Sequence, residues 1–264
     1  MTDLIGTTLH RLNLQLPSRV SVPGNDRYAT ATAIWAKSDR TPRAVVHCRT
    51  AEDVQAAIRA ARSCDLPLSV RGGGHDWAGR ALCDGLVIDV SGMNRVDLYL
   101  ENSTARIAGG TRAIALLGAV EACDMAAVTG SCGPVGMAGV TLGGGYGPLI
   151  GRFGLALDNL LSAEVVLADG RIVTALHDRE EELFWALRGG GGNFGVVTDM
   201  HLQLHCLSSV RSGMLVYPFA EARGCVRHRT PASALGRETL ASSQSNSELG
   251  QPHRRDRTDF SHAR

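Results

Sequence analysis

Clusters of glycine constrain this chain more than any other feature of its sequence. Many of the 31 glycines among 264 residues lie in or next to four short stretches: RGGGH (71–75), TGSC (129–132), LGGGYG (142–147) and RGGGGNFG (188–195). Glycine tolerates positive φ and lets successive backbone N–H groups converge on an anion. One glycine turn is routine, but several dense ones indicate a long ligand held by the backbone. The sequence therefore predicts a fold organised around ligand-binding loops.

The segments between these loops alternate between strand and helix patterns. Apolar runs and helical spacing predict a strand over 44–46, a helix starting at the capping pair Thr50 and Asp53, and strands over 66–70 and 86–90. A second block predicts a strand over 104–108, a helix over 113–123, a hairpin over 162–175 with an Asp169-Gly170 turn, a helix over 180–187 and a strand over 195–204. A short helix is expected over 28–35. Two successive mixed blocks predict an α+β (α/β-type) fold with two subdomains.

Composition excludes several classes of function. With 44% hydrophobic residues, 20% charged residues and a net charge of +1, the chain has no net field to attract nucleic acid or an acidic membrane surface. No signal peptide or membrane span is recognised, so a cytoplasmic location is expected. The seven cysteines show no zinc spacing. Six are expected to be buried thiols, and Cys132 is considered separately.

Two common nucleotide motifs do not explain the loops. Gly190, Gly192 and Gly195 satisfy G-x-G-x-x-G, but a helix pattern precedes them and a strand pattern follows, the reverse of the dinucleotide-binding order. Lys37 is the only lysine, so no P-loop exists. Taken alone, Arg71-Gly72-Gly73-Gly74-His75 is compatible with a phosphate cradle to which Arg71 adds charge, or with a tight turn that carries a surface histidine.

Three ordered motifs favour the first interpretation. RGGGHDWAG, TGSCGPVGMAGVTLGGGYG and FWALRGGGGNFGVVT together resemble the PCMH-type flavin domain of the vanillyl-alcohol-oxidase-like flavoproteins. The most similar branch is that of the berberine-bridge-enzyme-like proteins and carbohydrate oxidases. The resemblance implies that backbone N–H groups of the 71–75 loop hold the FAD pyrophosphate, and that His75 bonds covalently to the 8α-methyl group of the flavin. It further implies a second bond from Cys132 to C6.

The same resemblance implies the other cofactor contacts. The motif around Cys132 contributes Gly130, Val135, Gly136 and Gly139, with Val135 close to where the family controls access of O2. Four further glycines are expected to pack against the flavin or ADP portion, where a side chain would clash: Gly143, Gly144, Gly145 and Gly147. Val197 is expected to bring backbone near the adenosine or the ring edge. Trp77, Tyr146, Asp158 and Asn159 are expected to be structural.

The resemblance extends over about residues 28–222 and divides the chain. It implies an N-terminal segment (1–40), an FAD-binding domain (41–207, with subdomains of about 41–100 and 101–207) and the start of a substrate domain (208–222). Residues 223–264 are rich in Arg and Ser and are expected to be disordered, with a basic nucleic-acid arm as the alternative. The abrupt change near Arg223 motivates the hypothesis of a frameshift or truncation, by which the substrate domain and its catalytic base would be missing.

The implied function is an FAD-dependent oxidoreductase. It would pass a hydride from an alcohol or sugar-like CH–OH donor to covalently bound FAD, with O2 as the acceptor. Two alternatives stay open: a catalytically inactive flavin-binding remnant, and a binding module for another large anion. The expected partners are FAD and a small-molecule substrate of unknown identity, with no nucleic acid and no membrane.

Overall fold

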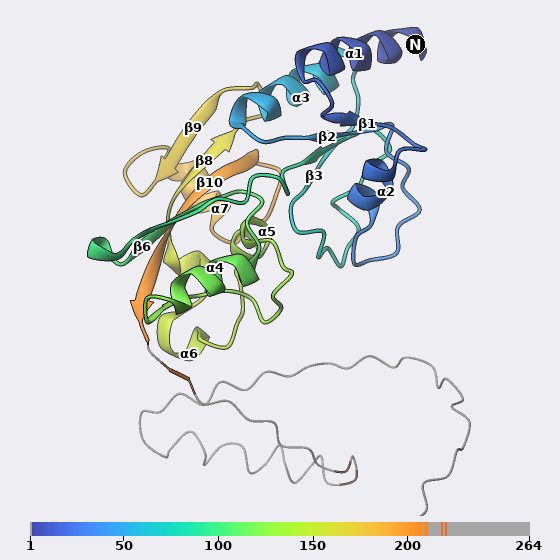
Figure 1. Cartoon of the computed structure of the whole chain (residues 1–264). Coiled ribbons are helices and arrows are strands. Elements are labelled where there is room, and N and C mark those ends of the chain that lie inside the picture. Colours follow the sequence, from blue (N-terminus) through green and yellow to red (C-terminus); the bar gives the residue numbers. More distant parts are fainter. Residues whose placement is uncertain (1, 208, 211–217, 219, 221–264) are drawn as a thin grey trace, which may run out of the picture.

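The computed structural model describes residues 2–207, 209, 210, 218 and 220 (Figure 1). These residues form two sheets with helices around them, as predicted for the α+β class with two subdomains. The tail predicted over 223–264, and most of the segment 208–222, lie outside the described residues.

The first sheet contains β1 (Val20–Ser21), β2 (Ala44–His47), β4 (Leu86–Asp89) and β3 (Leu68–Arg71), paired in that order. β2 and β3 both run parallel to β4, because α3 (Ala51–Ser63) carries the chain from β2 to β3. The predicted capping box of Thr50 and Asp53 starts α3. Since the three strands are parallel, their carboxyl ends share one edge of the sheet, from which the RGGGH loop emerges.

The N-terminal segment is part of this subdomain. α1 (Thr2–Gln15) lies against α3, and β1 extends the sheet antiparallel to β2 (Figure 1). Leu12 of α1 is buried in the same cluster as Val54 and Ile58 of α3. α2 (Asp26–Thr32) begins at Asn25, whose side chain accepts a hydrogen bond from the amide of Arg27.

The second sheet is antiparallel and is organised around β10 (Val196–Cys206). Its order is β5 (Val96–Tyr99), β6 (Thr104–Ala108), β10, β8 (Leu160–Val166) and β9 (Ile172–Leu176), and β7 (Met125–Ala127) pairs with the far end of β10. The predicted Asp169-Gly170 turn joins β8 to β9, with Gly170 at φ +87°.

Helices of the second subdomain cover this sheet. α4 (Ala113–Glu121) packs on β7, and α7 (Glu181–Leu187) packs on β9. The glycine-rich stretch 129–154 contains two short helices, α5 (Met137–Leu142) and α6 (Ile150–Phe153), and two 3-10 turns occur at Leu100–Asn102 and Ala156–Asn159. Val166 and Val196 of the second sheet share a buried cluster with Ile88 of the first, so the two sheets meet in a common core.

The structure differs from the sequence-based expectations in three places. The division between the sheets lies between Asp89 and Val96, whereas the sequence placed it near residue 100, because β5 pairs with β6. The helix expected over 28–35 ends at Thr32. Of the cysteines expected to be buried, Cys48 and Cys83 are buried, Cys64 and Cys123 are half-buried, and Cys206 is exposed at the end of β10. Cys225 lies outside the described residues.

Candidate functional site

Two predicted cofactor loops are packed against each other through their backbones. A Cβ atom on Gly73 would lie 2.5 Å from the amide nitrogen of Gly136 and 2.9 Å from the carbonyl oxygen of Pro134. A Cβ on Gly136 would in turn lie 2.7 Å from the amide of Gly73. The loop that carries His75 therefore adjoins the loop that carries Cys132, as a shared cofactor would require.

A third segment completes this junction. Gly109 and Gly110 follow β6, and a Cβ on either would overlap a carbonyl oxygen, of Val197 and of Val90 respectively. The next residue, Thr111, accepts a 2.8 Å hydrogen bond from the amide of Met137. Val197 itself is buried within β10, beside Gly109, so its predicted contact with a cofactor stays a prediction.

The predicted cofactor glycines fall into two groups according to what a Cβ would meet. For one group the protein itself requires glycine. Gly74, Gly144 and Gly145 have positive φ (72°, 110° and 79°), and Cβ atoms on Gly73, Gly136, Gly145 and Gly147 would collide with other segments. Gly130 is tight as well, since its Cβ would lie 3.2 Å from the Val140 side chain.

In the other group, neither the packing nor the backbone conformation requires glycine. A Cβ on Gly139 has nothing within 4 Å, the nearest atom to a Cβ on Gly72 is the Gly109 carbonyl oxygen at 3.9 Å, and a Cβ on Gly143 meets only carbonyl oxygens at 3.4 and 3.8 Å. None of these three has positive φ. At these positions the packing and the backbone conformation would accept a side chain, yet the residue is glycine. This is typical of a surface that a ligand approaches closely. The residues present therefore fit a bound dinucleotide.

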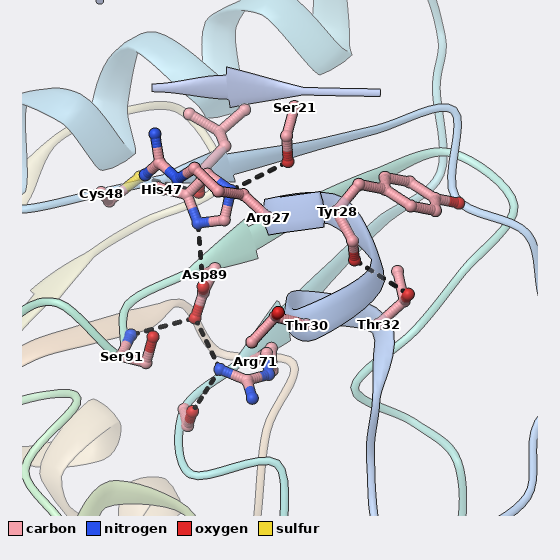
Figure 2. Close-up of polar contacts among 12 residues, drawn as sticks. Ser21, Arg27, Tyr28, Thr30, Thr32, His47, Cys48, Arg71, Asp89 and Ser91 are labelled. Atoms are coloured by element: carbon pink, nitrogen blue, oxygen red, sulfur yellow. Dashed lines mark hydrogen bonds and ion pairs between the residues drawn. The ribbon is translucent and has the colours of Figure 1, made fainter. Parts of the chain in front are cut away.

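Arg71 has a different environment from the one expected. The sequence suggested that Arg71 adds positive charge to a phosphate cradle, but the residue is 7% exposed and its Nη1 lies 3.1 Å from Oδ1 of Asp89 (Figure 2). The same Nη1 donates to the carbonyl oxygen of Gly72 at 3.4 Å, and Nη2 lies 3.1 Å from where a Cβ of Gly74 would stand. Arg71 thus supports the loop from behind while Asp89 balances its charge.

The ion pair belongs to a buried network that local sequence patterns did not predict. The strand register places His47, Asp89 and Arg71 side by side at the ends of β2, β4 and β3. His47 Nδ1 lies 3.1 Å from Oδ2 of Asp89, and its Nε2 lies 2.8 Å from Oγ of Ser21 (Figure 2). Because Ser21 is only 2% exposed, this Ser-His-Asp arrangement cannot reach a substrate and joins β1, β2 and β4 instead.

This network also controls the charge of Asp89. Burial alone would raise the pKa of the Asp89 carboxyl group, but the hydrogen bond from His47, the charge of Arg71 and the bonds from Ser91 outweigh it and hold the pKa below its ordinary value. Asp89 is therefore ionised near neutral pH and can keep Arg71, and with it the glycine loop, in place.

His75 forms a three-ring cluster with Trp35 and Trp77, whose own ring centroids are 6.0 Å apart. Its ring stacks on Trp35, with centroids 4.8 Å apart and an interplanar angle of 22°, and its Nδ1 accepts a 3.3 Å hydrogen bond from Nε1 of Trp77. Trp35 was missed in the sequence because it lies beyond the end of α2, where its amide donates to the carbonyl oxygen of Gly74. Trp77 and Tyr146 were expected to be packing residues, but both are exposed.

Cys132 is exposed on the loop between β7 and α5. The loop is held by the start of α4: the amide of Ala113 donates to Val135 O at 2.9 Å, and the amide of Ile114 donates to Gly133 O at 3.0 Å. An accessible thiol on a loop with a fixed backbone has the exposure that a covalent ligand bond requires.

Asn159 has the structural role that the sequence predicted. Its Nδ2 donates to the carbonyl oxygens of Phe153 and Leu155, and its Oδ1 lies 2.6 Å from Nε2 of His205. The His205 ring stacks on Phe153 with centroids 3.9 Å apart. These contacts fasten α6 and the turn after it to the end of β10.

The described part of the chain has neither a cluster of metal ligands nor a membrane-spanning helix. Residues 2–207 and the few described residues after them contain no group of three or more His, Cys, Asp or Glu side chains that could hold a metal ion. Within the same residues, no helix has the length and apolar character needed to cross a bilayer.

Comparison with known proteins identifies the family. The model of the FAD binding domain matches residues 42–176, which span β2 to β9 and include both the 71–75 and the 129–147 loops. This chain belongs to the FAD-binding domain family. The chain is 38% identical over 194 residues to (R)-6-hydroxynicotine oxidase of Paenarthrobacter nicotinovorans, an alignment that covers 73% of this chain and 42% of that protein.

Solved structures of the predicted branch are similar to this chain. The berberine-bridge-enzyme-like protein 1 of Physcomitrella patens superposes with a TM-score of 0.72 at 32% identity, covering 75% of this chain and 44% of that one. Xylooligosaccharide oxidase of Myceliophthora thermophila C1 has a TM-score of 0.72 at 30% identity, with coverage of 77% and 43%.

A further similar structure bears on the cofactor. The glucooligosaccharide oxidase of Acremonium strictum, described as containing 6-S-cysteinyl, 8α-N1-histidyl FAD, has a TM-score of 0.71 at 30% identity, with coverage of 75% and 42%. The chain thus spans about two fifths of the length of the relatives it matches. The predicted resemblance to berberine-bridge-enzyme-like proteins and carbohydrate oxidases is confirmed.

Proposed function

We propose that residues 41–207 hold FAD for an oxidoreductase that oxidises an alcohol or sugar-like CH–OH group. The observation that carries the proposal is the backbone contact between Gly73 and Gly136, which brings the His75 loop and the Cys132 loop together. The family match and the named oxidase relatives support the same conclusion.

Different loop residues would contact different parts of FAD. Backbone N–H groups of residues 72–74 would face the pyrophosphate, because glycine leaves them uncovered. The open surfaces at Gly72, Gly139 and Gly143 would lie against the cofactor, and the buried Arg71–Asp89 pair would keep the first loop in shape. FAD, when bound, supplies the two-electron acceptor that the protein side chains cannot provide.

His75 and Cys132 would tether the cofactor covalently. His75 would hold the 8α-carbon of FAD through an imidazole nitrogen, in place of one C–H bond of that methyl group. The two electrons of that bond would go to the flavin ring, and the protons of the methyl group and the imidazole would go to the ring and to solvent. The bond from the Cys132 sulfur to C6 replaces a C–H bond with the same balance. O2 is the proposed oxidant that restores the ring.

A second candidate is a flavin-binding module without turnover. Because the chain spans about two fifths of its oxidase relatives, and the resemblance assigns the catalytic base to a substrate domain beyond residue 207, residues 41–207 would bind FAD without supplying that base. Anaerobic addition of alcohols and sugars separates the candidates, since bleaching of the flavin absorbance by any of them supports the oxidoreductase.

The tethers are tested by retention of flavin after acid precipitation of the full chain. The wild-type protein should stay yellow. The variants His75→Ala and Cys132→Ala should each lose one bond, and the double variant should release all its flavin. Matched controls are His177→Ala and Cys206→Ala, which remove an exposed histidine and an exposed cysteine outside the loops. Flavin that is released from the wild type, or retained by the double variant, would refute the assignment.

A further inference from the structure

Two tryptophans are anchored around His75. The amide of Trp35 donates to the carbonyl oxygen of Gly74 at 2.8 Å, and the amide of Ala36 donates to that of Asp76 at 3.0 Å. The Asp76 side chain accepts hydrogen bonds from the amides of Ala78 and Ala81, at 3.0 and 2.6 Å, and thereby fixes the turn that carries Trp77. The backbone thus places both indoles beside one imidazole.

Burial does not explain the two tryptophans. Trp35 is 59% exposed and Trp77 is 67% exposed, although a tryptophan normally buries most of its surface. The two rings stack on each other with centroids 6.0 Å apart, and both also contact His75: Trp35 stacks on its ring, and the Trp77 ring lies tilted by 50° with its centroid 6.2 Å away. Trp77 also makes a hydrogen bond to His75, from its Nε1 to Nδ1 of the imidazole.

The chemistry of an indole N–H decides which tautomer that contact selects. Nε1 of tryptophan is a donor only, so Nδ1 of His75 must be the acceptor and the imidazole proton must be on Nε2. A nitrogen with a lone pair is a nucleophile, whereas a nitrogen that bears the proton is not. The partner of one ring nitrogen therefore determines which nitrogen can react.

We infer that Trp77 is a positioning residue that designates Nδ1 of His75 as the nitrogen that forms the flavin bond. The inference rests on the proposed tether. Trp77 holds the proton on Nε2 before the flavin carbon arrives, and Trp35 holds the ring plane. A cavity of about 430 Å³, lined by residues 35–37 and Trp77, gives the exposed indole room to turn away when Nδ1 reacts.

The tautomer is measured without FAD, by the ¹⁵N chemical shifts of His75 in the full flavin-free chain. Trp77→Phe keeps an aromatic ring but removes the N–H donor. Since one hydrogen bond is worth about 1 kcal/mol, the ratio of the Nε2–H to the Nδ1–H tautomer should fall about two- to tenfold. Trp185→Phe is the matched control, because Trp185 is 77% exposed and lies on α7; it should leave the ratio unchanged. An unchanged ratio in Trp77→Phe would overturn the inference.

The linkage itself is measured on the same variants after incubation with FAD. Peptides that contain histidyl-flavin should be linked through Nδ1 in the wild type and in Trp185→Phe, and a larger share should be linked through Nε2 in Trp77→Phe. Identical linkage in wild type and Trp77→Phe contradicts the role of Trp77. Absence of covalent flavin in the wild type refutes the proposed tether instead, and the ¹⁵N measurement still decides whether Trp77 selects the tautomer.

Discussion

Replacing Gly139 by alanine should separate the stability of the fold from the binding of FAD. Gly139 lies in α5, its φ is not positive, and a Cβ there has no protein atom within 4 Å. Gly118 in α4 has the same three properties and lies outside the predicted cofactor contacts. The two glycines are therefore a matched pair that differs in predicted proximity to the cofactor.

The two substitutions should affect the free energy of unfolding alike. Alanine is favoured over glycine inside a helix by roughly 0.5–1 kcal/mol, and a clash-free Cβ keeps that gain. For a chain of this size, a change of 1 kcal/mol shifts the Tm by about 2–4 °C. Both flavin-free variants should therefore melt slightly above the wild type, by up to a few degrees.

Affinity for FAD should differ between them. A methyl group placed where a ligand packs closely costs on the order of 1–3 kcal/mol, which corresponds to about 5- to 150-fold weaker binding. Fluorescence titration of FAD in a His75→Ala and Cys132→Ala background, where no covalent bond can form, measures this loss. Gly118→Ala should bind FAD as that parent does. If Gly139→Ala also binds FAD like the parent, the cofactor does not approach α5, and the open surface at Gly139 is not part of the binding site.

Three further predictions concern the framework around the site. Gly147→Ala should destabilise the protein by about 1–3 kcal/mol in urea unfolding, because its Cβ would overlap the carbonyl oxygen of Thr129, a backbone atom that cannot rotate away; a neutral effect would refute the packing. Asp89→Asn should lower the free energy of unfolding by about 3 kcal/mol, because it leaves the Arg71 charge buried without a partner. Since the pKa of Asp89 is lowered in the fold, the wild type should lose this stability as the pH falls below about 4. The free energy of unfolding of the variant should depend less on pH in this acidic range. Burial, and then the charge of Arg152, lower the pKa of His205, so the unfolded chain takes up the proton first and stability should fall as the pH drops below about 6.5, a decrease that His205→Gln should weaken.

The regular elements could be predicted because their signals are local. The capping box of Thr50 and Asp53 and the turn at Asp169-Gly170 each depend on residues within a few positions of one another, and both occur where the sequence placed them. β5 was missed because the strand is only four residues long and half-buried, so it lacks a clear apolar alternation.

The supports of the site could not be predicted for the opposite reason. His47 and Asp89 are 42 residues apart and meet only through the register of parallel strands. Trp35 fell inside a predicted helix, whereas the chain turns extended at Ala33 and pairs with the His75 loop. The ion pair of Arg71 could not be predicted because its partner, Asp89, is remote in sequence.

Mass spectrometry of proteolytic peptides from the full chain, prepared in the presence of FAD, tests the central claim most directly. The peptides containing His75 and Cys132 should carry the added mass of the flavin, and the peptide containing Cys206 should not. Flavin mass on neither peptide, together with no FAD retained by the undigested protein, would contradict the account.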